Sequence, residues 1–382
     1  MKKLLTLLGL AAACLGAPCQ PLAAPEIAAR NYLLVDMNAN QVLAEREADA
    51  SVDPASLTKL MTAYVVFQAL KDGKVALDQK LPVSARAWGE RKGGGSLMFV
   101  DPTLTPTVDE LLQGLVVDTG NDAAVVLAEG IAGGVDAFVA MMNRQAQAWG
   151  MKNTSFRNVT GNTEPGHRTT PRDLTVMAQH IVRDFPEHYH YYTQRDFTYN
   201  GIHQESRNLL LKRDPSIDGM TTGYTDAGGY CLLASALRDF PNGKRRLMAI
   251  VMGADSMQSR ANEAQKLLNW GYTSFDAIRL VEGGKAILTV PVWKGDSPQV
   301  GLGSAQAVYV AVPRGEGDHL KTRIERTDPL VAPLAKGQRV GTLKITSASG
   351  TSIAEIPITV LEPVPEAGLF GRAWDAVRLW IK

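Results

Sequence analysis

The sequence predicts an α+β fold, in which an antiparallel sheet is flanked by helices and joined to a helical subdomain, followed by a small all-β domain and a C-terminal amphipathic helix. Three observations predict this class. Apolar residues recur at helical spacing through residues 108–149, alternate at period two between turn signals in residues 286–360, and gather on one helical face in residues 369–381. A chain of 382 residues, 45% of them hydrophobic, is long enough to build separate cores for two domains.

The first 24 residues are typical of a secretory signal peptide. Two lysines follow Met1, and an apolar stretch over residues 4–13 precedes a group of small residues. This stretch is too short to span a bilayer as a permanent anchor, although Cys14 also allows a lipid-attachment site. Cleavage near residue 24 removes two of the three cysteines, so we expect the mature monomer to keep one buried thiol, Cys231, and no internal disulfide.

Four segments with strand patterns predict the sheet of the first domain: residues 32–36, 41–44, 228–236 and 246–253. Met37-Asn-Ala-Asn40 joins the first two into a hairpin, which we expect at an edge of the sheet. The other two are separated by a turn at Pro241-Asn-Gly243. Together they indicate an antiparallel sheet.

Helical spacing in residues 108–117, 123–131 and 135–149 predicts the helical subdomain. A further helix is expected over the apolar run 60–67, because Asp53 suits an N-cap and the proline after it suits the first turn. Ser56 then lies near the helix N-terminus.

Ser56 and Lys59 form a candidate nucleophile and base. Three residues apart, they share one face of the predicted helix. A serine hydroxyl becomes a good nucleophile when a neighbour takes its proton, and a desolvated lysine has a lowered pKa and can do so. The helix dipole favours the negative charge that develops on the attacked carbonyl. Taken by itself, the pair favours the other interpretation, a helix start that carries a solvated lysine.

Two later segments, Thr119-Gly-Asn121 and Thr221-Thr-Gly-Tyr-Thr225, make the catalytic interpretation the stronger one. In order and spacing the three segments resemble the S-x-x-K, S-x-N and K-T-G triplet of penicillin-binding proteins and serine β-lactamases. Further strings are similar to low-molecular-mass D-alanyl-D-alanine carboxypeptidases and extend the match over nearly the whole chain: Asp53-Pro-Ala-Ser-Leu-Thr-Lys59, Gly94-Gly-Ser-Leu-Met-Phe99, Arg213-Asp-Pro-Ser-Ile-Asp-Gly219 and Ala264-Gln-Lys-Leu-Leu-Asn-Trp-Gly271.

This resemblance implies a penicillin-binding transpeptidase or β-lactamase-like catalytic domain over residues 25–276. The implied enzyme is a serine carboxypeptidase that removes the terminal D-alanine from peptidoglycan pentapeptide stems through an acyl-enzyme on Ser56. It implies β-lactam antibiotics as covalent inhibitors, an oxyanion hole formed by the backbone N–H groups of Ser56 and Tyr224, and no cofactor or metal. The implied catalytic residues are Ser56, Lys59, Thr119 and Asn121, and the implied substrate-binding residues are Thr221, Thr222, Gly223, Tyr224 and Arg260.

The chain departs from the family pattern in two of the three motifs. Thr119 replaces a serine and keeps its hydroxyl, whereas Thr221 replaces the lysine that pairs with the terminal carboxylate of the substrate. Loss of one partner of a desolvated charge pair typically costs roughly 2–5 kcal/mol. We hypothesise that Arg260 compensates, since a guanidinium can hold a carboxylate through two hydrogen bonds; a surface arginine at a helix start is the alternative.

Two other functions stay open. The first is a catalytically impaired family member that still binds peptidoglycan, because Thr221 lacks the expected cation. The second is a β-lactamase or esterase on the same fold, whose mark is a carboxylate that activates the hydrolytic water. The sequence lacks the E-x-x-L-N arrangement that supplies this carboxylate in class A β-lactamases, which disfavours fast β-lactam turnover.

The strand patterns beyond the catalytic domain predict a β-sandwich-like domain over residues 277–362, interpreted as a spacer or interaction module: residues 286–293, 307–312, 341–346 and 353–360. The last 20 residues, 363–382, predict an amphipathic helix with Trp and Phe on its apolar face and cations opposite.

Such a helix suits an interfacial membrane anchor, the alternative being a helix docked on the β domain. With the signal peptide it predicts a periplasmic protein attached peripherally to the inner membrane, whose partners are the peptidoglycan stem and the membrane surface. A formal net charge of +1 gives no reason to expect nucleic acid.

Overall fold

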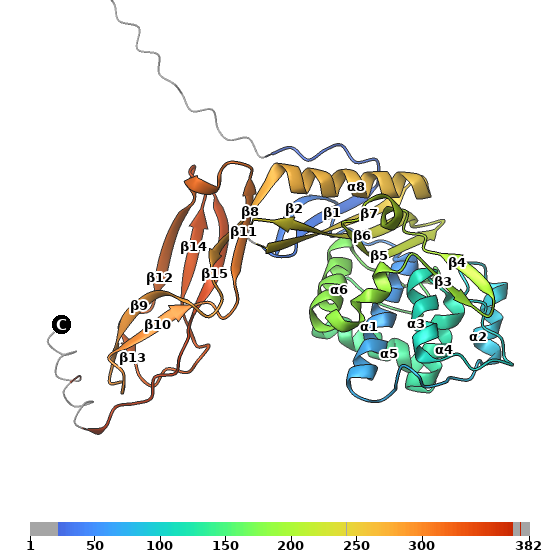
Figure 1. Cartoon of the computed structure of the whole chain (residues 1–382), viewed down its shortest axis with the longest axis horizontal. Coiled ribbons are helices and arrows are strands. Elements are labelled where there is room, and N and C mark those ends of the chain that lie inside the picture. The colour runs from blue at the N-terminus through green and yellow to red at the C-terminus, as the bar shows by residue number, and fades with distance from the viewer. Residues whose placement is uncertain (1–21, 242, 370–374, 376–382) are drawn as a thin grey trace, which may run out of the picture.

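The computed structural model describes residues 22–241, 243–369 and 375 (Figure 1). These residues form two parts, a domain of helices and sheet and an all-β domain beside it. The predicted signal peptide lies outside the described residues except for residues 22–24, and it remains a prediction. Of the predicted C-terminal helix, residues 363–369 and 375 are described; Val364 and Glu366 form isolated β-bridges rather than helix, so the helix was predicted to begin too early, and its remainder stays a prediction. No single described helix is long and apolar enough to cross a bilayer; α4 (Asn121–Ala132) and α5 (Val135–Ala148) meet that test only as a pair bent by 86°.

The central sheet of the first domain has the antiparallel order β2-β1-β7-β6-β5. Its strands are β1 (Asn31–Asp36), β2 (Gln41–Arg46), β5 (Ile217–Thr225), β6 (Gly229–Phe240) and β7 (Gly243–Ala254). Both predicted hairpins are confirmed, and the first lies at one edge as expected. The opposite edge is β5, the strand that carries Thr221 to Tyr224.

Helices cover both faces of this sheet (Figure 1). On one face lies α8 (Met257–Ser274), which begins at the N-cap Ser256 and packs on apolar residues of β1, β6 and β7. The other face carries the helical subdomain, whose core surrounds the apolar helix α1. Its elements are η1 (Ala55–Thr58), α1 (Lys59–Lys71), α2 (Ala85–Gly89), η2 (Glu90–Lys92), α3 (Val108–Val117), α4, α5, α6 (Pro171–Asp184) and η3 (Pro186–Thr193).

Three short elements connect the subdomain to β5: β3 (Asp196–Tyr199), β4 (Ile202–Glu205) and α7 (Leu210–Arg213). The helices predicted over residues 108–149 are confirmed. A capping box at Thr107 and Glu110 fixes the start of α3, because each side chain accepts from the backbone N–H of the other residue.

The start of the nucleophile helix differs from the prediction. Asp53 was expected as its N-cap, but Asp53 Oδ1 accepts a hydrogen bond from the backbone N–H of Ala55, two residues on, at 2.9 Å. This local turn, together with φ of +49° at Ala55, leads into a 3-10 turn before α1 begins at Lys59. Ser56 therefore lies in the 3-10 turn η1 and Lys59 in the first turn of α1.

The second domain is all β, and its predicted strands are confirmed. A six-stranded sheet of order β12-β14-β15-β10-β9-β13 shares one apolar core with the two-stranded sheet β11-β8. The strands are β8 (Phe275–Val281), β9 (Ala286–Trp293), β10 (Gln299–Gly303), β11 (Val308–Pro313), β12 (Lys321–Arg326), β13 (Leu330–Val331), β14 (Arg339–Thr346) and β15 (Ser352–Val360), with the turn η4 (Gly317–His319).

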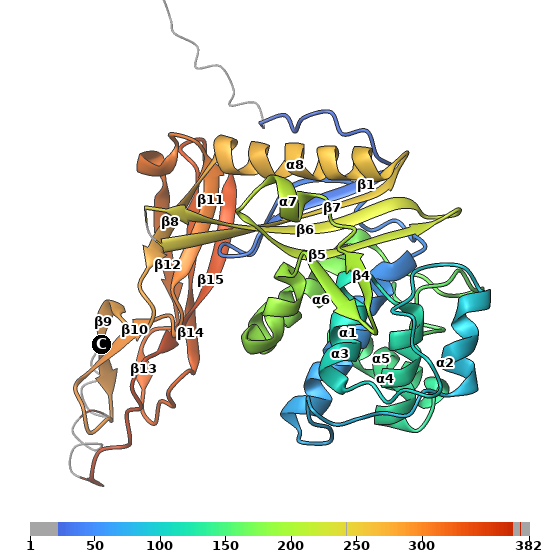
Figure 2. The ribbon, with the colours of Figure 1, turned by 45° about the vertical axis from the view of Figure 1, so that its right-hand side comes forward.

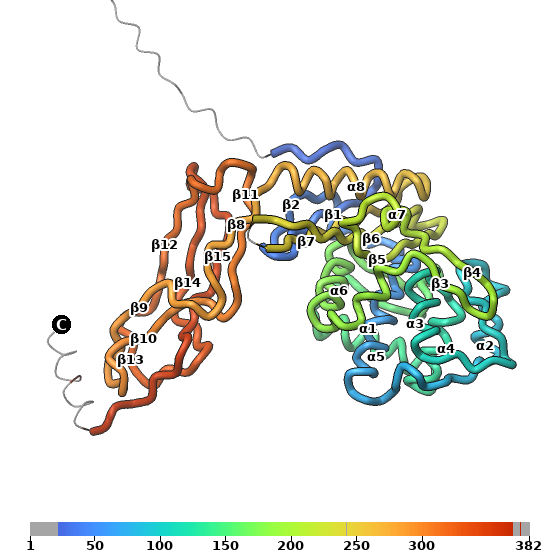
Figure 3. The backbone as a smooth tube through the Cα atoms, viewed as in Figure 1, coloured from blue at the N-terminus to red at the C-terminus, as the bar shows by residue number. Residues whose placement is uncertain are grey.

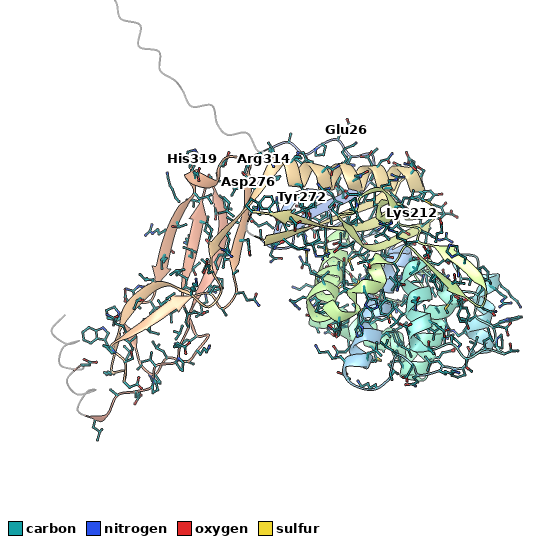
Figure 4. All side chains as sticks on the ribbon, in the orientation of Figure 1. Glu26, Lys212, Tyr272, Asp276, Arg314 and His319 are labelled. Carbon is teal, nitrogen blue, oxygen red and sulfur yellow. The ribbon has the colours of Figure 1, made fainter. Side chains whose placement is uncertain are left out.

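The two domains are joined without a linker, since α8 ends at Ser274 and β8 begins at Phe275 (Figure 3). Gln41 of β2 bridges them, because its Nε2 donates to Ile353 O at 3.3 Å and its Oε1 accepts from the N–H of Ala311 at 2.6 Å. Tyr272, Asp276 and Arg314 lie at this junction (Figure 4), where Arg314 Nη2 donates to Tyr272 O.

A buried ion pair supports the junction from within the sheet. Arg245 Nε lies 2.7 Å from Asp36 Oδ2, and both side chains are almost completely buried. Arg245 Nη1 also donates to the backbone carbonyl of Phe275, the first residue of β8, at 2.8 Å. One arginine thus ties β1, β7 and the β domain together.

Candidate active site

Most of the predicted site residues line one cavity, of about 240 Å³, where η1, β5, the start of α8 and three segments of the helical subdomain meet. Figure 2 shows β5 between the rest of the sheet and this subdomain. The lining residues are Ser56, Gly95, Ser96, Thr119, Asn121, Gly161, Asn162, Arg207, Thr222, Gly223, Tyr224, Thr225, Tyr230, Met257 and Arg260. Ser56, Thr119, Asn121, Thr222, Gly223, Tyr224 and Arg260 are therefore brought together as predicted. Thr221 is buried in β5 beside them.

Lys59 has the contacts of a general base. Its Nζ lies 3.1 Å from Ser56 Oγ, 2.7 Å from Asn121 Oδ1 and 2.6 Å from the carbonyl oxygen of Thr160. The residue is 3% exposed, and this burial lowers the pKa of the Lys59 amine to about 7. A neutral amine has two N–H donors and one lone pair. Asn121 and Thr160 can take the two donors, which leaves the lone pair for the Ser56 hydroxyl.

The carbonyl of Thr160 reaches Lys59 because the next residue is a glycine. Gly161 has φ of +89°, and a Cβ built on it would lie 1.8 Å from the carbonyl oxygen of Ala55. No larger residue fits this approach without moving the backbone. The side chain of Asn158 fixes the turn, since its Oδ1 accepts from the N–H of Gly161 at 2.7 Å.

Thr119 lies on the loop between α3 and α4, and Asn121 is the first residue of α4. The N–H of Asn121 donates to the carbonyl of Ser96 at 2.8 Å, and its Nδ2 lies 3.3 Å from Asn162 Oδ1. Thr119 is buried and has φ of +61°, in the left-handed region that a threonine rarely adopts. Backbone strain of this kind is frequent in catalytic loops.

The edge strand β5 forms the wall opposite Lys59. Gly223 packs so closely on η1 that a Cβ there would lie 3.0 Å from the backbone nitrogen of Ser56. Tyr224, 50% exposed, stands at the rim, where its ring lies 4.5 Å from that of Tyr230 and its hydroxyl donates to Asp226 at 2.8 Å. Behind the strand, burial raises the pKa of the Cys231 thiol to about 11, so the buried-thiol prediction is confirmed.

Arg260 is not a surface arginine. It is 3% exposed, and its Nη1 donates to the carbonyl of Gly223 at 2.9 Å while its Nη2 lies 3.4 Å from the carbonyl oxygen of Arg207. Burial lowers the pKa of the Arg260 guanidinium to about 10. With both terminal nitrogens on backbone carbonyls, Arg260 adds positive potential to the cavity and holds β5 against the Arg207 segment.

Arg207 is a cation of the cavity that the sequence did not reveal. Its side chain is 46% exposed, and its Nε lies 3.2 Å from Oδ1 of the buried Asp118. Among the described residues no hydrogen bond to its Nη groups is recorded. The guanidinium is thus anchored at one end and open to the cavity at the other. It belongs to none of the recognised motifs, so no sequence signal could have found it.

Among residues 22–241, 243–369 and 375, no group of three or more His, Cys, Asp or Glu side chains is arranged to hold a metal ion.

Comparisons with known proteins agree with this geometry. The family description D-alanyl-D-alanine carboxypeptidase matches residues 19–256, and that of the penicillin-binding protein 5 C-terminal domain matches residues 275–366. The chain is 40% identical over 365 residues to D-alanyl-D-alanine carboxypeptidase DacC of Escherichia coli, covering 94% of this chain and 90% of the relative. It is 39% identical to the DacA carboxypeptidase of Haemophilus influenzae over 360 residues, 94% of this chain and 91% of the relative.

Solved structures give the same result. Penicillin-binding protein 5 from Haemophilus influenzae superposes with a TM-score of 0.85 at 39% identity, covering 90% of this chain and 100% of that one. This similarity confirms the predicted penicillin-binding fold with its C-terminal β domain. A penicillin-binding protein from Listeria monocytogenes in its ampicillin-bound form superposes with a TM-score of 0.59 at 29% identity, covering 66% and 100% of the two chains.

Proposed function

The chain belongs to the family of D-alanyl-D-alanine carboxypeptidases, and from this membership we propose that it removes the terminal D-alanine from peptidoglycan pentapeptide stems. The single observation that carries the proposal is the contact at 3.1 Å between Nζ of the buried Lys59 and Oγ of the partly exposed Ser56. It pairs a nucleophile with a base whose pKa lies near neutrality.

In the proposed reaction Ser56 attacks the carbonyl of the penultimate D-alanine while Lys59 accepts the hydroxyl proton. The backbone N–H groups of Ser56 and Tyr224 stabilise the oxyanion. The C–N bond then breaks, and the proton passes from Lys59 to the leaving amine with Thr119 and Asn121 placed beside its path. Water attacks the remaining ester, and its proton returns through Lys59 to Ser56. Free D-alanine and a shortened stem are the products.

Recognition of the free C-terminus is proposed to rest on Arg207, with Thr222 beside it. Thr221 cannot supply a cation. Each terminal nitrogen of Arg260 uses one of its two N–H groups on a backbone carbonyl, so Arg260 can assist from the cavity wall but has fewer free donors than Arg207. Arg207 lines the cavity, and its Nη groups are free of the Asp118 contact that its Nε makes, so they can bind a carboxylate through two parallel hydrogen bonds. β-Lactams are proposed to acylate Ser56 in the same cavity, in line with the ampicillin-bound relative.

The test is acylation of the purified chain without residues 1–24 by a fluorescent penicillin, beside D-alanine release from diacetyl-lysyl-D-Ala-D-Ala. We expect labelling and release from the natural protein, and neither from Ser56→Ala. Labelling without release, with release restored by Thr221→Lys, would instead identify an impaired peptidoglycan-binding relative. Rapid turnover of the penicillin would identify a β-lactamase.

We further propose a periplasmic location with attachment to the inner membrane through residues 363–382. The last described segment, residues 361–369, lies at the end of the β domain farthest from the catalytic domain (Figure 1), so an anchor there would keep the cavity away from the membrane surface. Truncation after Pro365 should move the protein from the membrane fraction to the soluble fraction without loss of penicillin labelling. A truncated protein that stays with the membrane would contradict the attachment.

A further inference from the structure

His167 connects the two segments that hold the reacting groups. The residue is 5% exposed, its Nε2 lies 2.8 Å from Thr58 Oγ1, and its Nδ1 lies 2.9 Å from the backbone nitrogen of Arg157. A backbone N–H can only donate, so Nδ1 must be the acceptor and carries no proton. The ring is therefore neutral, with its proton on Nε2, where it donates to the hydroxyl of Thr58.

Both partners of His167 matter for the position of Lys59. Thr58 lies in η1, between Ser56 and Lys59. Arg157 lies at the start of the loop segment that leads to Thr160, and the carbonyl of Thr160 accepts a hydrogen bond from Lys59 Nζ at 2.6 Å. A second contact between loop and helix follows at Thr62, whose hydroxyl donates to the carbonyl of Val159 at 2.9 Å.

The base of this loop is closed independently of His167. Ser155 and Arg168 exchange backbone hydrogen bonds of 2.9 and 3.0 Å. Loss of the histidine should therefore leave the loop folded at its base and joined to α1 through Thr62, but should loosen the placement of the Thr160 carbonyl on Lys59.

We propose that His167 is a positioning residue for the acylation reaction. His167 joins Thr58 to the backbone of Arg157 and thereby holds the carbonyl of Thr160 against the Lys59 amine. This contact in turn holds the amine beside the Ser56 hydroxyl. The inference rests on the proposed function of the Ser56–Lys59 pair. It extends that function to a residue outside the cavity, since His167 is not among the lining residues.

A protonated ring cannot make this connection. A proton on Nδ1 would face the N–H of Arg157, and two donors repel each other. Burial lowers the pKa of His167, while the carboxylates of Asp53 and Glu164 favour the charged form and the guanidinium of Arg157 opposes it. The ring of Phe156 covers it at 6.0 Å. The connection should thus be intact at neutral pH and fail as the pH falls below the ordinary value for histidine.

The experiment measures the rate constant of penicillin acylation against pH for four proteins: the natural one, His167→Gln, His167→Leu and the control His203→Gln. His203 is exposed on β4, so its variant should match the natural protein. Glutamine can still donate to Thr58, whereas leucine cannot. We expect a fall of roughly 10- to 100-fold in His167→Leu, with most of the loss recovered in His167→Gln.

The slope of the pH profile separates positioning from a merely structural role. In the natural protein the logarithm of the rate should fall by one unit per pH unit below the pKa of Lys59, and by two units where His167 also becomes protonated. In His167→Gln the slope should stay at one. A His167→Leu rate equal to that of the natural protein, or a second slope that persists in His167→Gln, would overturn the proposal.

Two further measurements keep the proposal testable if the His167→Leu variant folds poorly. Thr58→Val should reproduce the loss and Thr58→Ser should not, which tests the connection even when His167→Leu folds poorly. Nitrogen NMR of the natural protein, assigned by comparison with His167→Gln, should show a neutral ring with its proton on Nε2 at pH 7, and a proton on Nδ1 would overturn the proposal. If penicillin failed to label Ser56 in the natural protein while the NMR result was as expected, the proposed function would be contradicted. The hydrogen bonds that join His167 to Thr58 and Arg157 would still stand.

Discussion

Replacing Lys59 with methionine should lower the rate of Ser56 acylation by roughly 100- to 10,000-fold, the usual contribution of a positioned general base. Methionine keeps the straight side chain in the buried position but has no amine to accept the hydroxyl proton. The cavity and its other residues should remain, so weak non-covalent binding of the penicillin should persist. Stopped-flow measurement of fluorescent penicillin labelling gives the rate directly.

The same lysine sets the pH dependence of the natural enzyme. Only the neutral amine can take the proton, and the pKa of Lys59 is lowered to about 7 by burial, so the acylation rate should rise with pH through about 7 and then level off. An ordinary lysine would place this rise near pH 10.4. Lys74 is an exposed lysine three residues after the end of α1, so the control Lys74→Met should change neither the acylation rate nor its pH profile. A flat profile between pH 6 and 8 would contradict Lys59 as the base.

Replacing Arg207 with alanine should reduce kcat/KM for diacetyl-lysyl-D-Ala-D-Ala by about ten- to a hundred-fold, because the guanidinium is half exposed and its charge-assisted hydrogen bonds to the carboxylate are worth roughly 1.5–3 kcal/mol. The effect should depend on the substrate carboxylate. A peptide ending in D-alaninamide, which lacks that charge, should be a poor substrate for the natural enzyme and should lose little more in the variant.

Thr221 offers the complementary test. Thr221→Lys restores a cation in β5. Combined with Arg207→Ala, it should therefore recover much of the carboxypeptidase activity that Arg207→Ala loses. Introduced alone into the natural protein, it should raise that activity less. Arg213→Ala is a suitable control, since Arg213 is exposed at the end of α7 and contacts Asn262 and Gln258. Equal losses of Arg207→Ala on the acid and the amide would show that the guanidinium does not bind the carboxylate.

The parts of the site that sequence could predict are those that local spacing or a motif determines. Ser56 and Lys59 are three residues apart in consecutive helical turns, so their contact follows once the segment is helical. Asn121 and Gly223 belong to recognised motifs. Sequence patterns predict the strands β1, β2, β6, β7, β9, β11, β14 and β15 but not β3, β4, β8, β10, β12 or β13, and helical spacing predicts the core of the helical subdomain.

The remaining parts depend on the approach of distant segments or on backbone atoms. The carbonyl of Thr160 contacts Lys59 across about a hundred residues of chain, and a carbonyl gives no sign in a residue-type pattern. Arg207 and Asp118 are joined only because β4 and α3 end close together. The wrong cap at Asp53 has a similar cause, because its carboxylate is equally able to bond the N–H two residues on.

The direct passage from α8 into β8 has a consequence for where the enzyme can work. With Gln41 and Arg245 bridging the junction, the cavity is held at a fixed distance from the far tip of the β domain. With the proposed membrane attachment through residues 363–382, the length of the β domain would set which peptidoglycan stems the cavity can reach, and the cavity would set only the reaction that follows. Enzymes that share this cavity but carry β domains of different length would trim different depths of the same wall.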